Sequence, residues 1–482
     1  MLLGTVLLGT EEEKHLPSVV FFSSVPKSTV PKSTVPKSIS LLIKKNKKKE
    51  VKIMKKVEPR TLAGFMELLP SEQILFEQMK NTIEETYQQF GFLPIDTPIQ
   101  ELSEVLLAKA GGETEKQIYR FEKGDTDISL RFDLTVPLAK YVAKNYGVLS
   151  FPFRRYQIGK VYRGEKVQKG RFREFYQCDI DIIGDGELSI LNDAELPSVI
   201  YTVFKRLGFD NFTIRMNNRK LLNGLFAEIG QKENSTEILR IIDKIDKIGK
   251  EAVQEELIKL GVESSHVEKI MTFILIQGTN QEKIKQLENL KIQNEEFNQG
   301  LEEMKQVLKY VGIFGVPEKN YQLDLTIARG LDYYTGTVYE TFLNDYRELG
   351  SVCSGGRYEN LADYYTDKKL PGVGISIGLT RLFYKLNELQ LIKADKKSIA
   401  DVLVISMVDD MEMPIKIATK LRNEGKKVEV YLNNKKLKAK FKYADKLEIP
   451  YVIIIGEDEI AKNIVKIKNM KTGEEFECNL FI

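Results

Sequence analysis

The sequence lacks the features of several large classes of protein. No uninterrupted apolar run approaches the roughly 20 residues that a membrane-spanning helix needs. The cysteines Cys178, Cys353 and Cys478 are odd in number and form no CxxC pair, so we expect neither a disulfide nor a structural zinc site. These absences predict a protein without membrane spans that works in a reducing compartment, the cytoplasm.

Two further absences concern catalysis and nucleotide binding. The chain has no GxxxxGK[ST] phosphate loop, and its only histidines, His15 and His266, lie outside every candidate site. The stretch GVGISIG at 372–378 does not fit GxGxxG and stands late in the chain, which argues against a dinucleotide-binding fold. Histidine-based catalysis is therefore excluded, and a nucleotide site must be built from arginines and backbone groups on a sheet.

Length and charge set the organisation of the chain. A chain of 482 residues with 42% hydrophobic and 29% charged residues is typical of a protein with several folded domains. The net charge of +3 is unevenly distributed, because residues 1–56 hold twelve lysines and four glutamates. That segment carries a surplus of eight positive charges, which leaves the rest at minus five, so contacts with nucleic acid must come from local basic patches.

Residues 1–57 have the composition of a disordered basic extension. Residues 25–38 repeat VPKST, a lysine-rich run follows at 44–49, and such low-complexity sequence cannot bury a core. An unstructured extension upstream of a start at Met54 is favoured over a targeting leader or an RNA-binding arm. The segment lacks arginine, and no basic region precedes its apolar beginning. Its role stays open.

From Thr61 the pattern becomes globular. We expect a helix from Ser71, as capping residue, to Phe90, and then an extended segment whose Pro94 and Pro98 suit a sheet edge or a dimer seam. Helical periodicity predicts a helical insertion at about 218–317 within a core spanning 58–390. After a linker at 391–399, short apolar runs alternating with helical patterns predict a small α/β domain at 400–482.

Two stretches alternate as strands do. In 128–135 the polar positions Ser129, Arg131, Asp133 and Thr135 share one face of a predicted half-buried strand. In 171–183 one face carries Arg171, Arg173, Phe175, Gln177, Asp179 and Asp181, and the other face is apolar. One face of the second strand is therefore expected to carry chemistry and the other to join the core.

Three residues around a predicted hairpin suit a purine nucleotide. Arg163 and Glu165 end one strand and Phe175 belongs to the next, so that together they can hold a phosphate, a purine amine and a purine ring. Taken alone, the hairpin fits an ordinary surface salt-bridge pair equally well. The glycine-rich strand at 372–378 offers nearly bare backbone to a flat ligand, and Arg381 in the next helix suits a polyphosphate.

These stretches resemble motifs 2 and 3 of class II aminoacyl-tRNA synthetases, and GFLPIDTP at 91–98 resembles motif 1. ARGLDYYTGTVYE at 328–340 and CSGGRYENL at 353–361 resemble the two signatures of the histidyl-tRNA synthetase family. The resemblance runs from about Glu58 to the end. It implies a multi-domain α/β fold with an antiparallel sheet flanked by helices, a helical insertion and a C-terminal domain resembling an anticodon-binding domain. It also implies a homodimer that ligates L-histidine to its tRNA through histidyl-adenylate, with ATP and substrate-associated Mg²⁺.

The resemblance further implies roles for single residues. Arg163 would hold the α-phosphate and Arg329 would act on it, as the two catalytic residues. The ATP site would consist of Arg163, Glu165 at the adenine amine, Phe175 at the adenine ring, and Arg171 and Arg381 at the outer phosphates. The histidine site would consist of Asp133, Thr135 and Gln177 at the α-amino group, Asp181 and Tyr334 at the imidazole, and Tyr333, Tyr358, Arg163 and Arg329 around them.

For tRNA, the resemblance implies contacts in two places. Lys166 and Gln168 lie in the loop of motif 2, which in this family meets an extra 5′ guanosine. A lysine at 166 gives a point charge where some members carry the planar fork of arginine, which puts base reading there in doubt. Lys435 and Lys438 lie in KKLKAKFK of the C-terminal domain, where a simply solvated lysine helix is the alternative.

Three other functions share parts of this pattern. A histidine-sensing regulatory subunit of the first enzyme of histidine biosynthesis has the same core, but such proteins lose motif residues and the terminal domain. A threonine or proline synthetase conflicts with LDYYTG, and zinc ligands for the threonine enzyme are missing. A purely RNA-binding protein would leave the polar strand faces unexplained.

Overall fold

The computed structural model describes residues 56–108, 113–327 and 333–479. Most of the predicted extension, 1–57, therefore lies outside the described residues, and residues 56–60 belong to no helix or strand. Within the described ranges, no helix is both long enough and apolar enough to cross a membrane.

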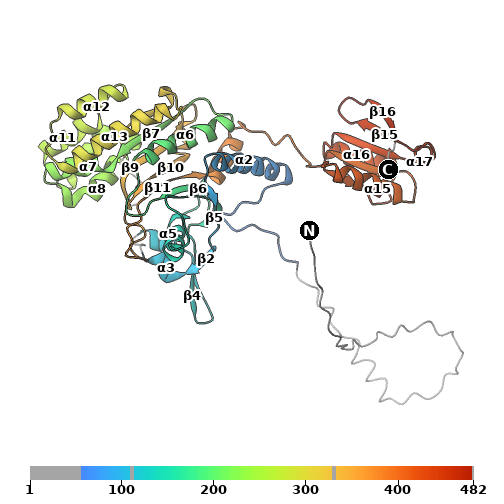
Figure 1. Cartoon of the computed structure of the whole chain (residues 1–482), viewed down its shortest axis with the longest axis horizontal. Coiled ribbons are helices and arrows are strands. Elements are labelled where there is room, and N and C mark those ends of the chain that lie inside the picture. The colour runs from blue at the N-terminus through green and yellow to red at the C-terminus, as the bar shows by residue number, and fades with distance from the viewer. Residues whose placement is uncertain (1–55, 109–112, 328–332, 480–482) are drawn as a thin grey trace, which may run out of the picture. The chain divides into compact units, whose positions relative to one another are not determined.

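A mixed sheet forms the centre of the structure (Figure 1). The six central strands are antiparallel, and each edge strand runs parallel to its neighbour. In spatial order the strands are β1 (Leu93–Pro94), β5 (Phe153–Tyr162), β6 (Glu174–Ile183), β11 (Gly372–Gly378), β10 (Cys353–Tyr358), β9 (Tyr334–Leu343), β7 (Phe212–Asn218) and β8 (Tyr321–Leu323). The predicted antiparallel core is confirmed, and the proline-containing segment does form an edge.

Helices cover the apolar face of this sheet. Cys178, Ile180 and Ile182 of β6 join one large apolar cluster with side chains from α2 (Pro70–Gln89), α6 (Leu191–Arg206) and α14 (Leu379–Glu388). The predicted alternation of residues 171–183 is thus confirmed from Glu174 onward. Because side chains of a strand point alternately to its two faces, the polar residues of β6 face the opposite side.

The first helix begins differently from the prediction. Pro70 is its first residue, and the Glu72 carboxylate accepts a hydrogen bond from the Leu69 N–H at 3.1 Å. Ser71 was therefore the wrong capping residue. Proline suits this position because its missing N–H would have no partner in the helix, and a carboxylate in the first turn takes up a free N–H.

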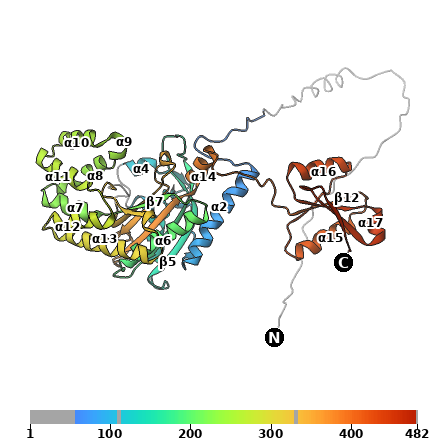
Figure 2. The same cartoon turned by 90° about the horizontal axis from the view of Figure 1, so that it is seen from above.

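Helices gather at one end of the sheet, as the green and yellow ribbons of Figures 1 and 2 show. They confirm the helical periodicity expected at 218–317. Gly224 allows two of these helices to approach closely, because a Cβ there would lie 2.5 Å from the Phe297 nitrogen. The helices are α7 (Arg219–Glu228), α8 (Ser235–Ile242), α9 (Ile245–Ile248), α10 (Lys250–Lys259), α11 (Ser264–Ile274), α12 (Asn280–Asn289) and α13 (Glu295–Ile313), with 3₁₀ turns at Lys232–Asn234 and Glu318–Asn320.

The strand expected at 128–135 is wrong beyond Leu130. The strand β4 (Thr126–Leu130) ends there, and α5 (Thr135–Asn145) begins at Thr135. One oxygen of Asp133 accepts hydrogen bonds from the N–H groups of Thr135 at 3.2 Å and Val136 at 2.9 Å. Such a local side-chain bond to the backbone starts a helix and outweighs the alternating pattern.

A small antiparallel sheet adjoins this segment. Its central strand β4 pairs with β2 (Gln100–Leu102) and with β3 (Arg120–Lys123). Two short helices, α3 (Ser103–Leu107) and α4 (Glu113–Gln117), lie between β2 and β3 in the chain. This sheet and α5 lie together on one side of the central sheet (Figure 1).

The C-terminal residues form a separate five-stranded sheet with helices on both faces. The three apolar runs expected as strands are confirmed as β12 (Val402–Ser406), β13 (Val428–Val430) and β14 (Tyr451–Ile455), all parallel. Two further antiparallel strands, β15 (Ile464–Asn469) and β16 (Glu475–Asn479), were not predicted. The helices are α15 (Glu412–Asn423), α16 (Leu437–Lys446) and α17 (Glu457–Lys462).

Candidate functional site

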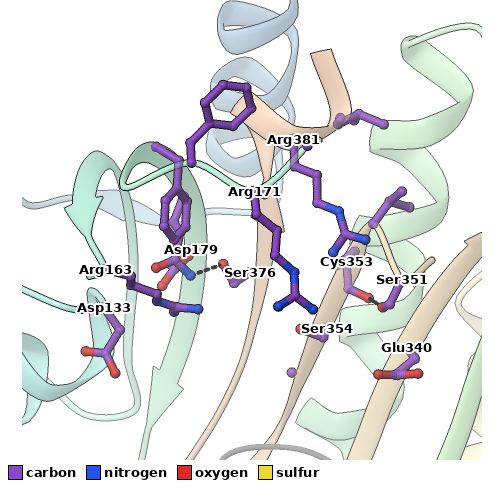
Figure 3. A pocket seen from close by; sticks show the side chains of 18 of the residues that line it. Asp133, Arg163, Arg171, Asp179, Glu340, Ser351, Cys353, Ser354, Ser376 and Arg381 are labelled. Atoms are coloured by element: carbon purple, nitrogen blue, oxygen red, sulfur yellow. Dashed lines mark hydrogen bonds between the residues drawn. The ribbon is translucent and has the colours of Figure 1, made fainter. Parts of the chain in front are cut away.

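A cavity of about 510 Å³ opens on the polar face of the central sheet. Its walls come from β6, β9, β10 and β11, the hairpin between β5 and β6, and the first turns of α14. In Figure 3, Arg171 and Arg381 reach into this space, while Glu340 lies on the wall opposite Asp133 and Arg163. Segments more than 200 residues apart in the chain thus meet in one site.

Most residues that the sequence singled out line this cavity. The five predicted for ATP are Arg163, Glu165, Arg171, Phe175 and Arg381. Those predicted for histidine that line it, besides Arg163, are Asp133, Thr135, Gln177, Tyr333 and Tyr334. One cavity therefore holds both predicted groups.

The three cavity arginines differ in how firmly they are held. The Arg163 guanidinium carbon lies 4.3 Å from the Phe132 ring centroid and 5.1 Å from that of Phe175, and its Nε donates to the Phe132 carbonyl at 3.2 Å. Burial lowers the pKa of Arg163, although the neighbouring Asp133 acts in the opposite direction. A guanidinium still carries its charge at neutral pH, so Arg163 is a fixed cation inside the protein.

The other two arginines lie closer to solvent. Arg381, in the first turn of α14, donates to the Leu349 carbonyl at 2.7 Å. Arg171 Nη1 lies 3.6 Å from Glu165 Oε2, and its side chain is half exposed. Planar guanidinium groups that converge on one space suit the oxygens of a polyphosphate.

Acidic and aromatic residues form the other end of the site. The Tyr358 hydroxyl donates to Asp181 Oδ1 at 2.8 Å, and Arg155 Nη2 lies 2.5 Å from Asp181 Oδ2. Burial raises the pKa of Asp181 to about 6, while the Arg155 charge and the Tyr358 hydrogen bond oppose that rise. The Tyr333 ring packs edge-on against Tyr334 at 4.9 Å and Tyr358 at 5.9 Å.

Two of the residues predicted for the histidine site do not line the cavity. Asp181 and Tyr358 bond to each other, and Tyr358 packs with Leu138 and Tyr333 in a second apolar cluster. The alternation of residues 171–183 had placed Asp181 on the correct strand face, and the resemblance had placed Tyr358 at the pocket, but the sequence could not show how far they lie from the open space.

The bare backbone face expected along β11 is largely covered. A Cβ on Gly374 would lie 2.2 Å from Asp181 Oδ1, and a Cβ on Gly372 would lie 2.4 Å from the Tyr358 ring. Of the three glycines of β11, Gly378 alone has nothing within 4 Å of such a Cβ, and it lines the cavity together with Ser376. The expected surface for a flat ligand is therefore limited to the end of β11, next to α14.

Some residues of the site were missed by the sequence reasoning. Ser376 accepts a hydrogen bond from Gln177 Nε2 at 2.8 Å, and Arg155 is completely buried beneath the acidic groups. The alternation of β6 had already placed Asp179 beside Gln177, which was the available signal. The missed residues that line the cavity include Asp179, Glu340, Ser351, Cys353, Ser354, Ser376 and Lys385.

The remaining candidates lie elsewhere. Lys166 and Gln168 are exposed in the loop between β5 and β6 and do not line the cavity. Lys435 and Lys438 are exposed just before and at the start of α16. Arg329 lies outside the described residues, and within them no group of three or more His, Cys, Asp or Glu side chains is arranged to hold a metal ion.

Comparison with known proteins identifies the family. Residues 64–382 match the family model of histidyl-tRNA synthetase, and residues 401–480 match that of the anticodon binding domain. The histidine–tRNA ligase of Clostridium tetani is 60% identical over 425 residues, which cover 88% of this chain and 97% of that protein. The chain belongs to the histidyl-tRNA synthetase family.

Other members of the family agree with this assignment. The histidine–tRNA ligase of Finegoldia magna is 50% identical over 87% of this chain and 97% of its own length. The crystal structure of histidyl-tRNA synthetase from Nostoc sp. PCC 7120 superimposes with a TM-score of 0.81 at 40% identity, covering 88% of this chain and 97% of that one. The predicted class II synthetase fold is thus confirmed.

A buried ion pair anchors the strand that carries Tyr358. The neighbouring Arg357 pairs with Asp193 of α6 at 2.6 Å and also donates to the carbonyls of Leu188 and Ser189. The pairing of β10 with β9 shifts register between Gly356 and Tyr358. Arg357 therefore fixes an irregular strand end to the helix layer.

We predict that Arg357→Met destabilises the fold by about 3–5 kcal/mol, because it leaves the Asp193 carboxylate buried without a counter-charge. This loss would be measured as a lower midpoint temperature of thermal unfolding. Arg120→Met is the matched control, since Arg120 forms an exposed pair with Asp127, also at 2.6 Å, and its loss should leave the midpoint unchanged. Equal effects of the two changes would contradict the prediction.

Proposed function

We propose that the chain ligates L-histidine to its cognate tRNA in protein synthesis, at the expense of ATP and through a histidyl-adenylate intermediate. The relatives named as histidine–tRNA ligases, which match most of the chain, support this activity. The observation that carries it is the single cavity that joins an arginine-rich end to an acidic and tyrosine-rich end. The first end suits the phosphates of ATP, and the second suits a cationic amino acid with a polar ring.

The first reaction needs no nucleophile from the protein. The histidine carboxylate attacks the α-phosphate and pyrophosphate leaves, so catalysis depends on positioning and on stabilising the developing charge. Arg163 holds the α-phosphate, and Arg171 and Arg381 hold the outer phosphates. Phe175 stacks on the adenine ring, and the Glu165 carboxylate accepts a hydrogen bond from the adenine amine. Arg329, as the second catalytic residue, also acts on the α-phosphate.

Histidine lies at the other end of the cavity. Asp133, Thr135 and Gln177 take its α-amino group. Asp181 and Tyr334 recognise the imidazole, with Tyr333 and Tyr358 packed around them. Mg²⁺ enters with ATP, and Glu340 on the cavity wall is a carboxylate of the type that this ion prefers.

The division of labour along the chain follows the central sheet and the C-terminal sheet. We assign adenylate formation to residues 58–390 with the helical insertion at 218–317, a linker to 391–399, and anticodon binding to 400–482. The exposed Lys166 and Gln168 and the exposed Lys435 and Lys438 are the tRNA-contacting residues. The protein is assigned to the cytoplasm.

Dimerisation is proposed through the edge of the central sheet. The edge strand β1 exposes Leu93 (58%), and Ile99 follows at 41%. Exposed apolar side chains along an unpaired edge favour association with a second copy.

We predict a dimer of the 55.2 kDa chain in sedimentation analysis, and a shift toward monomer in Leu93→Asp. The new charge would have to be buried in the interface, which is costly. Ile313→Asp is the control, because Ile313 is 68% exposed at the end of α13 and should leave the dimer intact. A dimer that is unaffected by the change at position 93 would place the interface elsewhere.

We predict that Arg329→Ala lowers histidine-dependent exchange of pyrophosphate into ATP by about 100-fold or more, as expected when a charge-stabilising group is lost. Histidine binding and the thermal midpoint should persist. The exposed Arg120, changed to alanine, serves as the control and should retain full exchange.

The same assay, run with every amino acid, separates the possible functions. Exchange with histidine alone supports the ligase. Histidine binding without any exchange would instead indicate a regulatory protein, and unchanged exchange in Arg329→Ala would remove the role given to that residue.

The lysines near α16 generate a separate prediction. Lys435→Ala combined with Lys438→Ala should leave exchange intact but raise the KM for tRNA. The affinity for tRNA should also depend less steeply on salt concentration, by an amount that corresponds to about two lost phosphate contacts. Lys426 and Lys427 provide the control pair, because they are exposed lysines of the same domain that lie directly before β13, whereas Lys435 lies after it. Equal effects of both pairs on tRNA charging would show that only general positive charge matters.

A further inference from the structure

Two buried acceptor atoms on the cavity side of β6 have no hydrogen-bond donor within the described part of the chain. They are Gln177 Oε1 and Asp179 Oδ1, and both side chains line the cavity. The Gln177 amide donates its Nε2 to Ser376, which leaves its oxygen as the free atom. Asp179 is only 2% exposed. Buried polar atoms without partners are rare, so a missing donor is the simplest explanation.

The charges around these atoms are also unbalanced. Among the described residues, the guanidinium groups that interact with the carboxylates of Asp133, Asp179 and Asp181 are those of Arg155 and Arg163. Fully ionised, this group would carry one negative charge too many in a buried place. Burial is the main reason why the pKa of Asp179 rises to about 7, and the charges of Asp181 and Asp133 add to it.

Within the part of the chain that the structure describes, Arg155 and Arg163 are the cations that interact with Asp179. Arg155 on β5 and Ser376 on β11 oppose the rise of its pKa. The remaining titratable groups that interact with Asp179 are neutral, because burial raises the pKa of each of them. They are Tyr87 on α2, Cys178 on β6, Tyr334 on β9 and Cys353 on β10.

A partner with a positive charge and at least two N–H donors would satisfy both acceptors and balance the ionised carboxylates. An ammonium group has three, enough to reach Gln177 Oε1 and Asp179 Oδ1 together. A metal ion fits less well, because no cluster of three or more candidate ligands occurs among the described residues. On the proposed function, on which this step rests, the ammonium group is that of the histidine substrate.

We infer that Asp179 binds the α-ammonium group of histidine beside Gln177, and that it is a substrate-binding residue in addition to those the family motifs suggested. Both acceptors then gain a donor, and the third carboxylate gains a counter-charge. A bound cation stabilises the ionised carboxylate, so any proton that Asp179 holds passes to the buffer when histidine binds. Histidine binding should accordingly weaken as pH falls through about 7.

The test is calorimetric titration of the full chain with histidine, in two buffers of different ionisation enthalpy, at one pH below and one above about 7. Asp179→Asn should bind histidine about 10- to 100-fold more weakly, as expected for loss of a charged hydrogen bond. Below pH 7 the wild type should release more protons than the variant. The difference isolates Asp179, because the titration of the ligand's own imidazole is common to both proteins.

Two controls make the result specific. Imidazolepropionate, which keeps the ring and the carboxylate but lacks the ammonium group, should bind wild type and Asp179→Asn equally. Asp185→Asn changes an exposed carboxylate just beyond the same strand, bonded to Tyr146, and should behave as wild type with both ligands.

Three outcomes decide between the hypotheses. Equal histidine affinity and equal proton release in Asp179→Asn would overturn the assignment. A variant that loses affinity for both ligands and also unfolds at a lower temperature would overturn it as well, because Asp179 would then support the fold. Absence of histidine binding in the wild type would instead reject the proposed function itself.

Unfolding temperature provides an independent check of the variant. The folded-state pKa of Asp179 lies above its ordinary value of 3.8, so the wild type loses stability as pH rises from about 3.8 to about 7. Asp179→Asn lacks this loss. The thermal midpoint of Asp179→Asn minus that of the wild type should therefore be larger above pH 7 than near pH 4.

Discussion

The buried carboxylate of Asp181 is the point on which the site depends. It pairs with Arg155 of β5 and accepts a hydrogen bond from Tyr358 of β10, while Gly374 of β11 leaves room for it. One side chain on β6 thus contacts three other strands of the sheet. Loss of Arg155 would leave this carboxylate without its counter-charge, and a side chain at position 374 would displace it. The register of these strands and the position of the polar side chains beneath the cavity therefore depend on the same contacts.

Stability and chemistry share the same strand. On one face of β6, Cys178, Ile180 and Ile182 pack under the helices, and on the other face Gln177 and Asp179 line the cavity. The apolar face fixes the position of the polar face, because a shift of the strand by one residue would turn every side chain to the opposite face. Burying charged groups costs free energy, and here the buried charges are held rigidly. Such rigid placement is what adenylate formation requires.

The sequence predicted this strand well because alternation is a local property. It also predicted the arginines and tyrosines that meet in the cavity, through motifs that name residue types at fixed spacings. It failed where a distant or competing contact decides the structure. The hydrogen bonds that Asp133 accepts from the N–H groups of Thr135 and Val136 in the first turn of α5 ended a pattern that alternation alone would have continued. The glycines of β11 were taken for open surface because Tyr358 and Asp181, which cover them, lie elsewhere in the chain. Asp179 was placed on the correct face, but its unpaired oxygen could be recognised only from the packed structure.

The proposed function also gives a meaning to the distribution of charge in the cavity. Arg171 and Arg381 lie at the end of the cavity near α14, whereas Asp179 and Asp181 lie further along β6. Arg163 lines the same cavity and interacts with Asp133 and Asp179 as well as with Glu165. On the proposed function, a zwitterionic amino acid would lie with its ammonium group toward the acids and its carboxylate toward Arg163. The attacking oxygen then faces the place proposed for the α-phosphate, so the same charges that select the substrate also orient it for the reaction.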